Sequence, residues 1–273
     1  MRQAFVAAAL VLALPWSAGA QEAAESVTVR TRADAVGDLY RFRSEARYAE
    51  RNADGDASQT NSQAFDVEVL GVTPDGLKLR YTLREASLTD SSGPSMETAL
   101  KALIGVPLEF RLRHDGTLAG LDNWEAFKTR VLAGVDAALP RLDTIRNIYH
   151  QRFAQEPLYA AQDMVLGDVR LMAIMEPVGP TPLGSKVVTD FRRSPPGRAL
   201  SDVRVLKAGC TVRVTRAAVG GSTGVRQDFT TDAVVSSRDG RVITLAQRRV
   251  ERAGASSVDE SVNIRRVSPA PAC

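Results

Sequence analysis

The segment from Gly220 to Gly224 has the spacing of a hydrolase nucleophile elbow. Its letters, Gly-Gly-Ser-Thr-Gly, match the G-x-S-x-G pattern, in which a strand precedes the serine, a helix follows it and a histidine lies further along the chain. Here the following residues, Val225 to Phe229, alternate as a strand does, and no histidine follows Ser222. The sequence therefore favours a flexible hairpin loop over a catalytic serine.

Metal-binding patterns are equally incomplete. Zinc generally takes three or four nitrogen or sulfur ligands, whereas the chain has two histidines, His114 and His150, and two cysteines that we expect to be bonded to each other. The segment that starts at Asn52 resembles a calcium loop, but its glycine, Gly55, is the fourth residue rather than the sixth, and the twelfth is Gln63 rather than glutamate. We expect no catalytic residues, no metal site and no cofactor, and therefore a protein that is not an enzyme.

The first twenty residues are organised like a secretory signal peptide. A basic start at Arg2 precedes an unbroken apolar run from Ala4 to Leu14, and Ser17–Ala20 ends in the A-x-A form that signal peptidase cleaves. The apolar run is shorter than the ~20 residues that a membrane-spanning helix needs. We expect cleavage after Ala20, a mature chain of residues 21–273 without an integral membrane segment, and residence in the periplasm, with secretion as the alternative.

An exported chain meets an oxidising compartment, and this one has two cysteines, Cys210 and Cys273. We predict that they form an intramolecular disulfide that ties the C-terminal tail to a strand; two free thiols or an intermolecular bridge are the alternatives. In the chain-entropy model a loop of this size contributes roughly 4 kcal/mol to stability.

Charge patterning argues against a nucleic-acid partner. The chain has 35 Lys and Arg against 32 Asp and Glu, and the two signs are interleaved, as in residues 41–45. Without a run of basic residues, nothing in the sequence is arranged to grip a phosphate backbone.

Most of the chain alternates between apolar and polar residues with a period of two, which is typical of half-buried antiparallel strands. The pattern runs from Val27 to Leu88, with hairpin turns at Asp54-Gly55 and Asp75-Gly76, and it returns from Thr181 onward. In the second region the predicted strands cover residues 186–191, 203–219, 227–236, 242–250 and 258–267.

The middle of the chain is predicted to be helical, in a block near residues 122–166. Asp122 and Glu125 resemble a capping box that opens an amphipathic helix. We call its apolar side the tryptophan stripe, which consists of Trp124, Phe127, Val131 and Val135. Either this helix packs permanently on the sheet, or a hydrophobic ligand lies between the stripe and the sheet.

These patterns predict a mainly β fold of the α+β class. We expect antiparallel meanders that form a curved sheet or incomplete barrel of roughly ten strands, with two or three helices packed on it. One β-rich domain over residues 21–273 is the simpler organisation; two β subdomains, at about 27–121 and 181–267, are the alternative.

This order of strands, helices and strands behind a signal peptide resembles exported half-barrel proteins of the periplasmic lipoprotein-carrier type. It is also similar to uncharacterised exported β-rich proteins of bacteria. The resemblance rests on the meander from Tyr40 to Leu83, the turn and strand at 114–118 that lead into a helix, and Val165–Asp168 before the second β region.

The resemblance implies an incomplete barrel, closed by helices, that binds acyl chains or another apolar ligand without chemistry. We therefore predict a non-enzymatic carrier for a hydrophobic ligand such as a lipid, which would contact the tryptophan stripe. The alternative is a structural or protein-interaction component of the bacterial cell envelope, with an envelope protein as partner.

Overall fold

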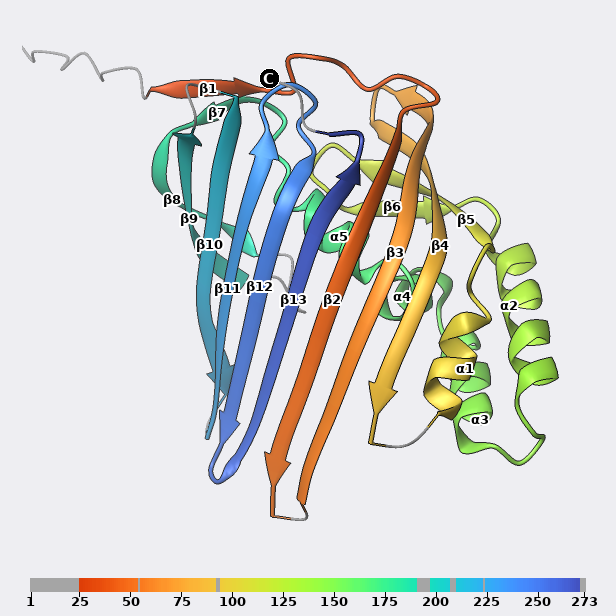
Figure 1. Ribbon diagram of the computed structural model, residues 1–273. Coiled ribbons are helices and arrows are strands. Elements are labelled where there is room, and N and C mark those ends of the chain that lie inside the picture. The colour runs from red at the N-terminus through yellow and green to blue at the C-terminus, as the bar shows by residue number, and fades with distance from the viewer. Residues whose placement is uncertain are drawn as a thin grey trace, which may run out of the picture.

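A long, curved and unclosed antiparallel sheet dominates the computed structural model (Figure 1). The structure describes residues 25–53, 55–91, 94–190, 197–206, 210–222 and 224–270. Within them lie thirteen strands, instead of roughly ten, and five helices, instead of two or three. The predicted fold class, antiparallel meanders in a curved sheet with helices packed on it, is confirmed.

The first half of the sheet contains the predicted N-terminal meander, extended by two further strands. Its strands are β2 (Leu39–Asn52), β3 (Gly55–Thr73), β4 (Gly76–Asp90), β5 (Pro107–Arg113) and β6 (Leu118–Leu121), each paired with the next. The turn between β3 and β4 depends on Gly76, whose φ is +152° and whose missing Cβ would lie 2.0 Å from the carbonyl oxygen of Leu112. Only glycine fits this approach of β4 to β5.

The second half consists of the C-terminal strands. They are β8 (Gly184–Asp190), β9 (Gly197–Leu206), β10 (Thr211–Ser222), β11 (Val225–Ser236), β12 (Val242–Ala253) and β13 (Ser256–Ser268). The single strand predicted over residues 203–219 was wrong, because β9 and β10 are separate antiparallel partners in which Leu206 lies opposite Thr211.

The two halves meet through the first long strand and the last one. β2 pairs with β13, so the strand order is β6-β5-β4-β3-β2-β13-β12-β11-β10-β9-β8. Two short strands, β1 (Ser26–Val29) and β7 (Gly179–Pro182), pair with each other beside one end of the sheet (Figure 1). One continuous sheet thus contains strands from both predicted β subdomains; the domain organisation itself stays a prediction.

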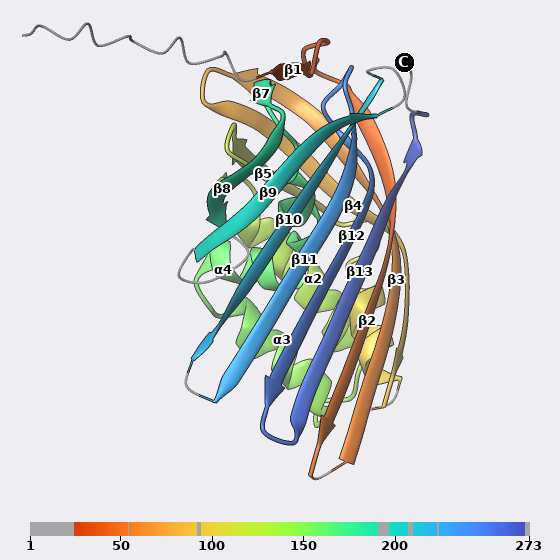
Figure 2. The ribbon, with the colours of Figure 1, turned by 90° about the vertical axis from the view of Figure 1, so that its left-hand side faces the viewer.

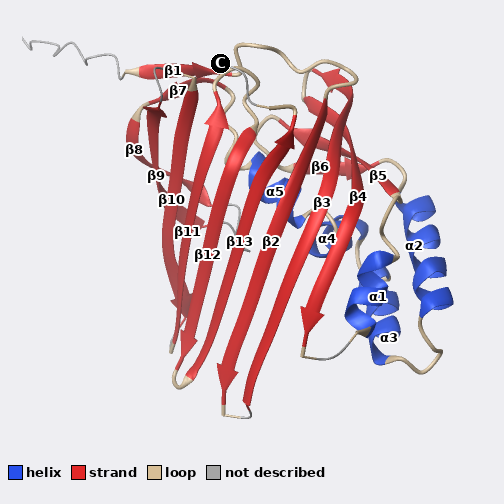
Figure 3. Ribbon diagram, in the orientation of Figure 1, coloured by secondary structure: helices blue, strands red, loops and turns tan. Residues whose placement is uncertain are grey.

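The helices lie on one side of the sheet, and the sheet bends around them (Figures 2 and 3). They are α1 (Ser95–Lys101), α2 (Trp124–Ala138), α3 (Thr144–Phe153), α4 (Pro157–Met164) and α5 (Gly167–Ala173). We call this side the concave face and the opposite side the helix-free face. Tyr40, Phe42, Phe65 and Leu245 are among the concave-face side chains that form one buried core with the helices.

The start of α2 differs from the prediction. The residue that caps the helix is Asn123, and its amide oxygen accepts a hydrogen bond from the Glu109 backbone, in β5, at 2.8 Å rather than from the helix. Asp122 forms ion pairs with Lys78 at 3.2 Å and Arg111 at 3.0 Å. The predicted capping box was therefore wrong, because its acid anchors the helix entrance to β4 and β5.

Candidate functional site

The tryptophan stripe forms the centre of the helical block. Trp124, Phe127, Val131 and Val135 are only 6%, 2%, 0% and 0% exposed. The Trp124 ring stacks on Phe127 at 5.8 Å and on Phe153, from α3, at 5.4 Å between ring centroids. None of the four lines the cavities described below. These contacts hold α2 to α3, and a role in contacting a ligand stays a prediction.

α5 is the helix that builds the candidate site, and the sequence did not predict it. It carries four buried residues, Val169, Leu171, Met172 and Ala173, and lies across the concave face behind β13 (Figure 1). Its seven residues show no amphipathic stripe, because the sheet and the other helices bury it on several sides. The continuous apolar run from Leu171 to Met175 was the available signal.

The first cavity, which we call the central cavity, lies between α5 and the middle of the sheet and has a volume of about 530 Å³. The α5 wall includes Leu171. The facing wall consists of Gln227, Phe229, Gln247, Arg249, Glu260 and Val262. Arg249 donates a hydrogen bond to Glu260 at 3.0 Å, and its guanidinium lies over the Phe229 ring, 5.7 Å from the ring centroid. Apolar surface and a mutually neutralised ion pair therefore share this wall.

The second cavity, the helix-side cavity, lies between β2–β4 and the helices α1, α3 and α4, with a volume of about 340 Å³. Its lining mixes apolar side chains with amides and a phenol. Among the lining residues are Ala46, Asn61, Gln63, Leu88, Tyr149 and Met164. Burial raises the pKa of Tyr149 to about 12, so its hydroxyl keeps its proton at neutral pH and can donate a hydrogen bond.

Asp168, the second residue of α5, belongs to the linings of both cavities. Burial raises the pKa of this carboxyl, and a hydrogen bond from the Ser44 hydroxyl opposes the shift. Ser44 itself is buried on β2. A carboxyl group between two partly apolar cavities can accept or donate a hydrogen bond according to its protonation, which suits recognition of a polar group on a ligand.

One end of the concave face is closed by buried charges, which we call the Arg241 cluster. Arg241 forms ion pairs of 2.8 Å with both Glu176, after α5, and Asp34, in the β1–β2 connection. Arg30 contacts the same carboxylates at 3.0 Å (Asp34) and 3.8 Å (Glu176). Burial alone lowers the pKa of Arg241, but the two carboxylates outweigh it and hold the pKa above the usual value. The cluster ties α5 to the sheet.

The residues first considered for catalysis are scattered. β11 follows the Gly220–Gly224 segment directly, where a nucleophile elbow needs a helix. The ring nitrogen Nε2 of His114 lies 3.0 Å from the Pro74 carbonyl oxygen, and that of His150 lies 2.6 Å from a carboxylate oxygen of Asp136. Among the residues that the structure describes, no group of three His, Cys, Asp or Glu side chains is placed to hold a metal ion.

Several predicted features lie outside the described residues. These are the signal peptide, Asp54 of the calcium-like loop, Thr223 and Cys273. The disulfide between Cys210 and Cys273 therefore stays a prediction. In the described part of the chain, every helix is too short or too polar to cross a bilayer.

No protein-family model matches the sequence, and no curated protein matches it. Among solved structures, one of lipid–protein interactions in lipovitellin is similar, with a TM-score of 0.48 and 11% identity over 88% of this chain. This chain spans only 26% of that lipovitellin chain.

Two further structures match with lower scores. DynF from the dynemicin biosynthesis pathway of Micromonospora chersina has a TM-score of 0.22 and 8% identity, over 89% of this chain and 86% of its own. An outer membrane lipoprotein-sorting protein domain from Vibrio parahaemolyticus has a TM-score of 0.17 and 9% identity, over 84% and 86%. These likenesses concern the fold alone.

Proposed function

We propose that this protein is an exported, non-enzymatic carrier that binds an amphipathic ligand, such as a lipid or another acyl compound, on its concave face. The observation that carries the proposal is the pair of cavities that meet at Asp168, with volumes of about 530 and 340 Å³. Ligand sites combine apolar walls with placed polar groups, and both linings mix apolar side chains with polar and charged ones, which suits an amphipathic ligand. The signal-like residues 1–20 support export to the periplasm.

The arrangement assigns different parts of the ligand to different walls. Leu171, Phe229 and Val262 offer apolar surface to a hydrocarbon chain in the central cavity. Asp168 offers a hydrogen bond to a polar group where the two linings meet, and Tyr149 offers one within the helix-side cavity. The Arg241 cluster closes the end of the face beyond α5, so a ligand would enter from the opposite end or from the side of β8–β10.

The test is extraction of the purified protein with organic solvent, followed by mass spectrometry of any bound lipid. Val262→Trp places an indole in the central cavity and should abolish co-purification. Val250→Trp is the matched control, because Val250 alternates to the helix-free face of β12 and lies outside both linings. Circular dichroism confirms that both variants fold. Absence of lipid from the wild type and failure to bind added fatty acids would refute the carrier.

The tryptophan stripe enters the proposal as a further contact for a long chain. A ligand that reaches it has to separate Trp124 from Phe153, and Trp124 is the single tryptophan of the mature chain. Its fluorescence should change when a fatty acid is added. Binding without a fluorescence change would confine the ligand to the two cavities.

A second candidate function, interaction with an envelope protein, rests on the edge of the sheet. β8 is the outermost strand and pairs only with β9 among the described residues. Val187 and Leu200 lie opposite each other there and are 55% and 54% exposed. An exposed edge strand with apolar side chains can accept a strand from a partner. Val187→Lys should abolish association with the envelope fraction if this function is the correct one.

A further inference from the structure

The helix-free face carries four arginines in one row that runs across the sheet, on strands β2, β13, β10 and β9. Along the pairing registers, Arg43 of β2 lies opposite Arg265 of β13, and Arg213 of β10 lies opposite Arg204 of β9. Thr244 and Val234, on β12 and β11, complete the row between the two pairs. Directly opposed like charges on adjacent strands destabilise a sheet, so two such pairs in one row require an explanation.

The β9–β10 pair is neutralised within the protein. Arg213 forms a two-pronged ion pair with Asp232, and Arg204 forms a single-contact ion pair with Asp202 at 2.7 Å. These carboxylates remove the repulsion between the two guanidinium groups.

The β2–β13 pair is not neutralised in this way. Arg43 contacts Glu85 at 3.2 Å, but both side chains are at least half exposed, which makes the pair weak. No residue in the described part of the chain forms an ion pair or hydrogen bond with the Arg265 side chain, which is exposed. The two opposed arginines therefore have a single weak ion pair between them. Another anion can offset the repulsion that remains.

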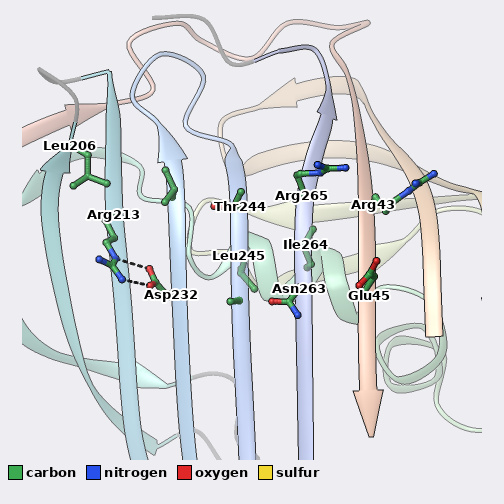
Figure 4. Close-up of a pocket in the computed structure, with 12 residues that line it drawn as sticks. Arg43, Glu45, Leu206, Arg213, Asp232, Thr244, Leu245, Asn263, Ile264 and Arg265 are labelled. Atoms are coloured by element: carbon green, nitrogen blue, oxygen red, sulfur yellow. Dashed lines mark hydrogen bonds and ion pairs between the residues drawn. The ribbon is translucent and has the colours of Figure 1, made fainter. Parts of the chain in front are cut away.

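A hollow of about 590 Å³ lies on the same face, and Arg43 and Arg265 are part of its lining (Figure 4). In Figure 4 the Arg265 side chain extends along the surface toward β2, while Thr244 lies on β12, on the other side of β13, and Asn263 lies further along β13. The hydroxyl and amide of these two residues are neutral hydrogen-bond donors within the hollow.

Two carboxylates also line the hollow. Asp232 is engaged by Arg213, and Glu45 lies on the same face of β2, two residues from Arg43. The lining contains three arginines against two acids, and a third acid, Glu85, contacts Arg43 from outside the lining, so among the described residues Arg265 is the lining arginine without an ion pair.

We propose that Arg43 and Arg265 form an anion-binding site for a phosphate group, which bridges the two guanidinium groups in a hollow that Thr244 and Asn263 also line. Guanidinium groups match the oxygen geometry of phosphate with paired, charge-assisted hydrogen bonds. Bridging also converts the cross-strand repulsion into attraction of both residues to one anion. The phosphate belongs either to a lipid headgroup or to a free phosphate compound. This site lies on the face opposite the two cavities. Its test is therefore independent of the test of the proposed carrier function.

Isothermal titration calorimetry with inorganic phosphate, at constant ionic strength, tests the site. Loss of one charge-assisted contact should weaken binding by about tenfold or more in Arg265→Gln. Arg47→Gln is the matched control, because Arg47 is another exposed arginine on the same face of β2 and does not line the hollow. Absence of binding to the wild type, or equal loss in the two variants, overturns the proposal.

Vesicles distinguish the two sources of phosphate. If the site takes a lipid headgroup, the protein sediments with vesicles of phosphatidylglycerol and phosphatidylcholine but not with phosphatidylcholine alone, and Arg265→Gln abolishes this while Arg47→Gln does not. If phosphate binds in solution and neither vesicle does, the site serves a free phosphate compound.

Discussion

Replacement of Arg241 by methionine tests the account of the closed end of the concave face. The substitution keeps much of the apolar stem of the side chain and removes the guanidinium group that lies 2.8 Å from both Glu176 and Asp34. Both carboxylates are almost fully buried. Arg30 remains as their cation, but it reaches Glu176 only at 3.8 Å.

The expected cost follows from this geometry. Removing one partner of a buried ion pair typically destabilises a protein by about 3–5 kcal/mol, because the remaining charge is left without compensation. Since Arg30 compensates part of the charge, we expect the lower part of that range, about 3 kcal/mol. For a chain of this size the unfolding midpoint temperature should fall by about 6–12 °C.

Urea unfolding followed by Trp124 fluorescence measures the free energy of unfolding. Arg238→Met is the control, because Arg238 lies exposed in the same turn and its loss should change stability by less than about 0.5 kcal/mol. Adding Glu176→Gln to Arg241→Met should recover part of the loss, since it removes an uncompensated charge. A cost of Arg241→Met below about 1 kcal/mol would show that the cluster does not hold α5 to the sheet as argued.

Three further outcomes are expected. Asp168→Asn should raise the free energy of unfolding at neutral pH. Burial raises the pKa of Asp168, so the neutral carboxyl, which is the form that favours folding, is lost as pH rises through that pKa. The gain in stability from Asn should therefore vanish in acid, where Asp168 is itself neutral. Urea unfolding at neutral and acidic pH measures this, and an equal gain at both contradicts it. Non-reducing peptide mapping should link Cys210 to Cys273, and Cys273→Ser should cost roughly 4 kcal/mol; two freely alkylated thiols in unreduced protein refute the bond. Intact-mass measurement of a periplasmic extract should find Gln21 at the N-terminus, and a mature form that retains Met1 would rule out processing.

The strands were predictable because each long strand has one face in the core and one in water. On β2, Tyr40 and Phe42 are buried and Arg41 and Arg43 are exposed, which is the alternation visible in the sequence. The division between β9 and β10 was missed, although the buried positions change parity across it. Val203 is odd, whereas Val212 and Val214 are even, and a single strand cannot bury both sets on one face.

The candidate site was less predictable than the fold. α5 is too short and too uniformly apolar to show a helical period, so its residues were placed before a strand region rather than in a helix. The cavities depend on how far the sheet bends away from the helices. The distance between the sheet and the helices depends on the register of many strands together. The sequence around Asp168 therefore cannot predict it.

The pairing of β2 with β13 also determines the order in which the chain can assemble. The other long strands pair with neighbours in sequence, whereas this seam joins residues roughly 200 positions apart, and contacts of such separation form slowly because a large loop must close first. During synthesis or export the N-terminal strands emerge first, so one edge of β2 stays unpaired until the last strand arrives. Unpaired strand edges promote aggregation. The arginines at positions 41, 43, 47 and 51 place charged side chains along β2, and these oppose aggregation through its unpaired edge. The concave face is therefore completed only when β13 has paired with β2.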